Sequence, residues 1–147
     1  MSPISLSIFF FFVYLVLIFL AGGAAYVIEV YGGYAFPKTA LGIVVLSVAS
    51  YLAAKRYVRL TETAPSPRTM WRLSIYLGIA AAFALLSLLP LVIQNTDQEL
   101  LNQPGSGTML IIVLTLIYVV QTLLIRVFFG MGVNQEIAKQ KTTGSAP

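Results

Sequence analysis

Four long apolar segments alternate with short polar or turn-rich segments along this chain of 147 residues. The apolar segments cover residues 4–28, 39–58, 69–93 and 108–130. At a rise of 1.5 Å per residue, about 20 helical residues cross a hydrocarbon core of roughly 30 Å, so each segment is long enough to span a bilayer. The pattern predicts an all-α, polytopic membrane protein. Its four transmembrane helices would form one antiparallel bundle, and residues 1–147 would make up a single domain.

Glycine, proline and serine residues mark where the apolar segments begin and end. Gly32 and Gly33 break the chain after the first segment. Pro37 suits the first turn of the second helix, where its missing N–H costs nothing. Ser66 and Pro67 fit the N-cap and the first residue of the third helix. The ends of the first three helices are therefore predicted from turn chemistry as well as from hydropathy.

Two polar segments flank the fourth apolar segment. Residues 94–107 carry Asp97 and Glu99 but neither Lys nor Arg, and their glycines and proline predict a loop. The tail, residues 131–147, ends in small polar residues. We expect the tail to be cytoplasmic and partly disordered, with structure only in an initial helical turn or two.

The first apolar segment has a second interpretation, a secretory signal peptide cut between Ala21 and Ala25. Residues 1–7 contain no Lys or Arg, and the apolar run is longer than the apolar core of an ordinary signal peptide. We therefore expect this segment to be retained as the first span.

The composition agrees with lipid as the solvent. Apolar residues make up 59% of the chain and charged residues only 10%, whereas soluble domains have roughly 45–50% and about 25%. The net charge of +4 comes from residues beside the apolar segments, so they do not form the folded basic face that nucleic-acid binding requires. We expect the lipid bilayer as a partner and no nucleic acid.

The residues that most enzymes use are absent. The chain has no Cys and no His, which removes thiol chemistry and the commonest general base and metal ligand. It has no HExxH or GxSxG motif and no glycine-rich phosphate loop, and its acidic residues do not share a predicted site. We expect no catalytic residue, no cofactor and no metal site.

Basic residues predict the orientation. The connector between the second and third segments carries five bases against a single acid, Glu62. The bases are Lys55, Arg56, Arg59, Arg68 and Arg72. A short basic loop stays on the cytoplasmic side, which places both termini inside and leaves only Lys38, of nine basic residues, outside. We expect a multi-pass protein of the bacterial inner membrane, and the five bases are its topology determinants.

Small residues recur at helical spacing in the second and third segments. They form one stretch on the second segment and two small-xxx-small pairs on the third. The stretch is Ser47, Ser50 and Ala54, and the pairs are Gly78 with Ala82 and Ala80 with Ala84. Small side chains allow helix backbones to approach closely in membranes, so these positions predict helix–helix contacts.

A polar stripe runs along the fourth segment, within one sector of the helix at 100° per residue. The stripe consists of Thr115, Tyr118, Thr122 and Arg126, while Gln121 points elsewhere. Such a stripe either lines a cavity or consists of groups that bond to backbone and to neighbouring helices. Arg126 comes 18 residues after Thr108, about 27 Å along the axis, which places it near the inner headgroups, where its side chain can snorkel.

The connector also carries a resemblance. The stretch AAKRYVRLTETAPSPRTMWRLS, flanked by two spans, resembles a family of small four-helix inner-membrane proteins of unknown function in Proteobacteria. The residues that match are Tyr57, Val58, Arg59, Ala64, Pro65, Arg68, Trp71 and Arg72. The resemblance implies a four-helix membrane fold and implies no activity.

Three classes of function are compatible with the sequence. The favoured one is a non-catalytic membrane protein that acts through helix packing, either as a homo-oligomer or with a membrane-protein partner. The second is a small channel or transporter subunit, for which the polar stripe is the reason. The third is an immunity-type protein against a pore-forming toxin. Small multidrug transporters depend on a glutamate within the first span, whereas the first acid here is Glu29, at the end of the first apolar segment.

Overall fold

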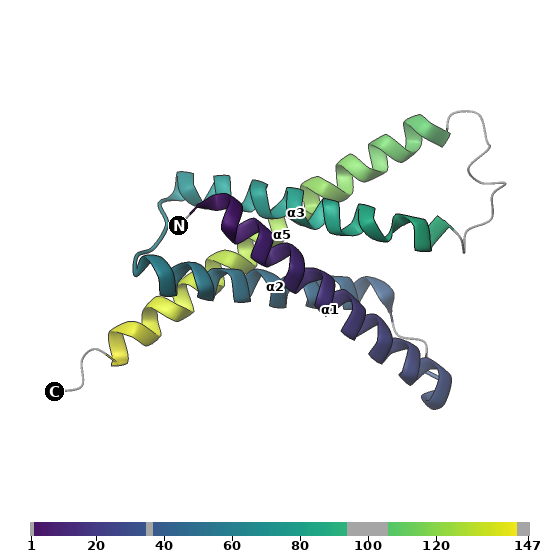
Figure 1. Cartoon of the computed structure of the whole chain (residues 1–147), viewed down its shortest axis with the longest axis horizontal. Helices are drawn as coiled ribbons and strands as arrows, with labels where there is room; N and C mark the ends of the chain where they lie inside the picture. Colours follow the sequence, from purple (N-terminus) through teal and green to yellow (C-terminus); the bar gives the residue numbers. More distant parts are fainter. Residues whose placement is uncertain (1, 35–36, 94–105, 144–147) are drawn as a thin grey trace.

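The structure is a computed structural model that describes residues 2–34, 37–93 and 106–143. Four helices account for nearly all of them: α1 (Pro3–Gly32), α2 (Lys38–Thr61), α3 (Pro67–Ile93) and α5 (Ser106–Thr143) (Figure 1). All four are long and apolar enough to cross a membrane. The prediction of an all-α chain with four such helices is confirmed, and the expected loop at residues 94–107 lies mostly outside the described residues.

Each helix packs against two neighbours. Helix α1 contacts α2 and α3, α5 contacts the same two helices, and the contact between α2 and α5 is the most extensive. The order around the bundle is therefore α1, α2, α5, α3. In Figure 1 the helices cross at an angle. The second half of α1 and the start of α2 lie on one side and diverge from the second half of α3 and the start of α5.

The helix ends follow from local chemistry. Helix α1 ends at Gly32 and is capped by Gly33, whose φ of 66° suits a residue without a Cβ. The backbone N–H of Thr69 donates to Oγ of Ser66 at 3.2 Å, and α3 begins at Pro67, which confirms the predicted cap. Pro37 lies one residue earlier than expected, at the N-cap of α2, because its ψ of 102° is extended rather than helical.

Helix α5 is longer than the sequence analysis predicted. It continues to Thr143, so the expectation that residues 131–147 are disordered after a turn or two is wrong for the described part of the tail. The extra turns are held by contacts with the rest of the bundle: Val133 is buried and Ile137 packs against the core. With 38 residues, α5 is about 57 Å long, well beyond the thickness of a hydrocarbon core.

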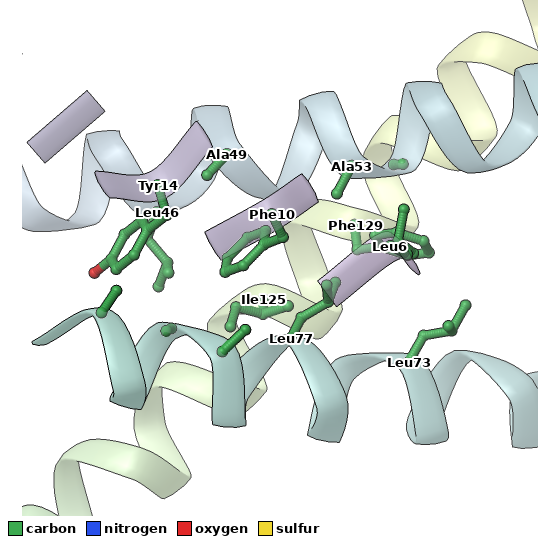
Figure 2. Packing of buried hydrophobic residues seen from close by; sticks show 14 of the residues in the cluster. Leu6, Phe10, Tyr14, Leu46, Ala49, Ala53, Leu73, Leu77, Ile125 and Phe129 are labelled. Carbon is green, nitrogen blue, oxygen red and sulfur yellow. The ribbon is translucent and has the colours of Figure 1, made fainter. Parts of the chain in front are cut away.

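The core occupies only one half of the bundle. Figure 2 shows side chains from all four helices meeting there, including Phe10 of α1, Ala53 of α2, Leu77 of α3 and Ile125 of α5. The buried apolar side chains fall within residues 6–14, 45–58, 73–84 and 125–133. These ranges form the half that includes the α2–α3 connection, whereas the diverging half buries few side chains.

Two glycines allow the closest approaches between helices. A Cβ atom at Gly132 of α5 would lie 2.8 Å from Cβ of Ala54 in α2, and at Gly78 of α3 it would collide with Oγ1 of Thr122 in α5. The predicted contact role of Ala54 and Gly78 is therefore confirmed. Because Cβ contacts below 3.0 Å are essentially never seen, neither glycine can gain a side chain without movement of a helix or a neighbouring group.

We predict that Gly132→Ala lowers the free energy of unfolding in detergent by about 1–3 kcal/mol, since the added methyl group overpacks the α2–α5 contact. The matched control is Gly130→Ala, two residues earlier, where the new methyl group would be 3.7 Å from Sδ of Met70, an ordinary contact. The control should be neutral or stabilising by up to about 1 kcal/mol because alanine favours the helix. Equal thermal stability of the two variants would contradict the close approach.

Candidate functional site in the helix bundle

A buried hydrogen bond joins the two helices that face each other across the bundle. Nε2 of Gln121 in α5 donates to Oη of Tyr14 in α1 at 3.2 Å, and both side chains are buried. The ring of Tyr14 stacks on Phe10, with centroids 5.6 Å apart. An unpaired amide or hydroxyl in an apolar interior costs several kcal/mol, so this pair fixes how α1 and α5 are placed relative to each other.

Thr122, next to Gln121, faces a different helix. Its side chain is buried against Gly78 of α3, and the edge of the Tyr118 ring lies beside the same glycine. Oγ1 of Thr122 has no hydrogen-bond partner among the described residues. The hydroxyl therefore serves here as a small group that fills the space over Gly78, at a close approach of α3 and α5.

The polar stripe of α5 does not form one surface. Thr115 is exposed on the diverging half, and its hydroxyl donates to the backbone carbonyl of Ile111 at 2.8 Å. Tyr118 is half-buried and lines a cavity of about 160 Å³ between α3 and α5, together with Gln121. Thr115 therefore lies on the surface of the bundle, whereas Tyr118 lies in the contact between α3 and α5. The hydroxyl of Thr115 is hydrogen-bonded within its own helix.

Arg126 is placed against an aromatic ring. Its guanidinium carbon lies 3.8 Å from the centre of the Trp71 ring, and Trp71 is in the second turn of α3. A guanidinium over an indole gains about 0.5–2 kcal/mol, depending on how far both groups are removed from water. This contact joins α3 and α5 near the end of the bundle that carries the basic connector.

The bases of the connector have separate surroundings. Arg56 of α2 lies over the Phe9 ring of α1, with 4.2 Å to its centre. Arg68 and Arg72 are exposed in the first two turns of α3. Lys55 is half-buried on α2, beside Arg56. The structure therefore brings some of these bases into helix contacts and leaves others on the surface.

Arg59 and Glu136 form the ion pair that holds the end of α5 on α2. Nε of Arg59 lies 3.3 Å from Oε1 of Glu136. The Arg59 side chain is 64% exposed whereas that of Glu136 is 9% exposed, so water screens much of the attraction. Oε2 of Glu136 has no hydrogen-bond partner within the described residues. The pair is one of the contacts between the C-terminal part of α5 and α2.

An apolar cleft opens in the diverging half of the bundle, where α1 and α2 separate from α3 and α5. It has a volume of about 400 Å³ and is lined by residues from all four helices. Most of the lining is aliphatic, and the Tyr14–Gln121 pair supplies the polar groups. The aliphatic lining includes Ile43 and Leu46 of α2, Leu85 of α3, and Leu116 and Val120 of α5. We call this space the apolar cleft.

Sequence reasoning missed Gln121 and Tyr14 as a pair, because the two residues are 107 positions apart. The available signal was a lone amide in an apolar segment, which must find a partner if it is buried. Among the described residues no group of three or more Asp, Glu, His or Cys side chains could hold a metal ion. The chemistry of these surroundings is packing and a few polar contacts.

The chain matches no protein-family model, and no curated protein or solved structure matches it significantly. The resemblance to small proteobacterial inner-membrane proteins therefore stays a prediction.

A double-mutant cycle tests the contact between Arg126 and Trp71. We predict that Arg126→Leu and Trp71→Leu are coupled by about 1 kcal/mol in the free energy of unfolding, because either change alone removes the cation–π contact. Arg126→Lys keeps the charge and should retain most of the stability. The control cycle pairs Trp71→Leu with Arg72→Leu, whose side chains are adjacent in sequence but lie on different sides of the helix. A coupling as large in the control as in the test pair would show that the contact is not specific.

Proposed function

We propose that this protein is a multi-pass protein of the bacterial inner membrane with four antiparallel spans. The support is the surface of the chain: large apolar side chains are exposed on all four helices, including Phe12, Ile43, Phe83 and Ile112. Soluble monomers rarely expose contiguous apolar areas of this extent, whereas lipid solvates them. The Glu29 end of α1 and the residues just after it carry exposed aromatic side chains, Tyr26, Tyr31 and Tyr34, as expected of a membrane interface.

The proposed orientation has both termini in the cytoplasm. The end of α2 and the start of α3 carry five basic residues, and Arg126 contacts the same end through Trp71. Positive charge favours the cytoplasmic side of a membrane. The long C-terminal part of α5 then projects into the cytoplasm as a helix, with Glu136 bound to Arg59 at the level where α2 ends.

The activity that we propose is non-catalytic helix packing with a further transmembrane helix, contributed by a second copy of this chain or by a partner protein. The single observation that carries it is the apolar cleft. A volume of about 400 Å³ holds several side chains, and its lining comes from four helices that diverge instead of closing on one another. In a membrane, helices associate through close packing, and the aliphatic side chains that line the cleft offer a surface for it.

The alternative of a channel or transporter subunit has less support. An ion path needs rings of carbonyl oxygens or charged side chains. The cleft is mainly aliphatic. In the polar stripe, Thr115 faces the surface of the chain and Thr122 faces Gly78. The immunity-type alternative has no contact among the described residues in its favour.

Photocrosslinking from the cleft tests the packing proposal. A photoreactive amino acid is incorporated at Val120 during synthesis of the chain, and crosslinking is carried out in native membranes. We expect a protein adduct, whose mass distinguishes a second copy from another partner. The matched control carries the same photoreactive amino acid at Val119, since Val119 is 47% exposed and Val120 49%, but Val119 does not line the cleft.

Lipid adducts alone at both positions would contradict the proposed packing function. A protein adduct at Val120 that survives Leu116→Trp would also contradict it, because Leu116 lines the cleft and the larger ring should prevent docking.

A further inference from the structure

Another cavity, separate from the apolar cleft, lies at the opposite, basic end of α2. It is a groove of about 460 Å³ between α1 and α2. Phe9 lines it from α1, and Leu52, Lys55, Arg56, Arg59 and Leu60 line it from α2. The α2 positions recur at spacings of three and four residues, so they form one face of the helix. We call this space the basic groove.

The groove brings together three bases and one nearby acid. Glu136 lies 3.3 Å from Nε of Arg59 and offsets part of its charge. Lys55 and Arg56 therefore supply most of the excess positive charge. The guanidinium of Arg56 is also held in place, because it lies 4.2 Å from the centre of the Phe9 ring. A planar guanidinium fixed beside an ammonium group is a suitable donor set for a phosphate oxygen pair.

The rest of the lining is apolar. Phe9, Leu52 and Leu60 provide hydrocarbon surface next to the charges. A free phosphate ion would contact the bases but would leave this surface uncovered. A molecule with a phosphate at one end and an alkyl chain at the other matches both parts of the groove, and basic pockets between transmembrane helices on the cytoplasmic side are typical sites for anionic lipid headgroups.

We propose that the basic groove binds one anionic phospholipid. Its phosphate contacts Lys55, Arg56 and Arg59, and an acyl chain lies along Leu52 and Phe9. This site goes beyond the proposed packing function and does not use the apolar cleft. It relies on the membrane placement, because the groove must be at the level of the headgroups to receive a lipid laterally.

Native mass spectrometry of the protein in detergent tests the site, with phosphatidylglycerol, phosphatidylcholine and inorganic phosphate as probes. We expect one phosphatidylglycerol to stay bound in preference to phosphatidylcholine, and inorganic phosphate at millimolar concentration not to displace it. Lys55→Gln with Arg56→Gln should weaken phosphatidylglycerol binding by about 30-fold, since each base near the surface contributes about fivefold.

The matched control is Arg68→Gln with Arg72→Gln, which removes the same charge from the same end of the bundle, outside the groove. It should bind phosphatidylglycerol like the parent protein. Leu60→Glu is a second test that removes no base: the Leu60 side chain is 61% exposed, and an acid there should repel the headgroup without loss of folding.

Three results would overturn the proposal. Equal loss of binding in the control variant would mean that charge acts without a defined site. Equal retention of phosphatidylcholine would mean that only the apolar surface binds. Displacement by inorganic phosphate would mean that the groove holds a free anion. Because these measurements do not involve Val120, their failure would leave the crosslinking result, and with it the proposed packing function, unaffected.

Discussion

The close approach of backbones at small residues is the constraint on which the arrangement of the helices depends. Helices that are apolar on most sides, as α1 and the first half of α5 are, have no single face that the hydrophobic effect selects. In lipid, shape and polar contacts must choose the partner surfaces instead. Gly132 against Ala54 joins α5 to α2, and Gly78 against Thr122 joins α5 to α3. Helix α5 therefore contacts α3 at Thr122 and α2 at Gly132, at two different positions along its axis.

The two halves of the bundle have different physical characters. One half has the buried core, the glycine contacts and the aromatic–cation pairs of Arg56 and Arg126. The other half diverges, and apolar side chains of α1 and α5 are exposed there among the described residues. We infer both proposals from this arrangement: a lipid headgroup at the closely packed, charged end and a transmembrane helix at the open, apolar end.

Much of the helix layout could be predicted from the sequence, because long apolar segments and turn residues such as Ser66 and Pro67 act locally. The continuation of α5 was missed, although Val133, Glu136 and Ile137 fall at the spacing of one helix face. The pairing of Gln121 with Tyr14 depends on how distant helices cross, which no local pattern specifies. For the same reason the polar stripe, regular in sequence, is divided in the structure between the exposed Thr115 and the buried Thr122.

The central claim is that the chain spans a membrane with its basic end in the cytoplasm, and thiol labelling in intact cells tests it most directly. The natural chain has no Cys, so a single introduced thiol reports its own side of the membrane. Tyr34→Cys, at a position that is 76% exposed beyond α1, should react with a membrane-impermeant maleimide in intact cells. Ser66→Cys, exposed between α2 and α3, should react only after the cells are permeabilised. Labelling of Ser66→Cys in intact cells, with Tyr34→Cys protected, would contradict the account.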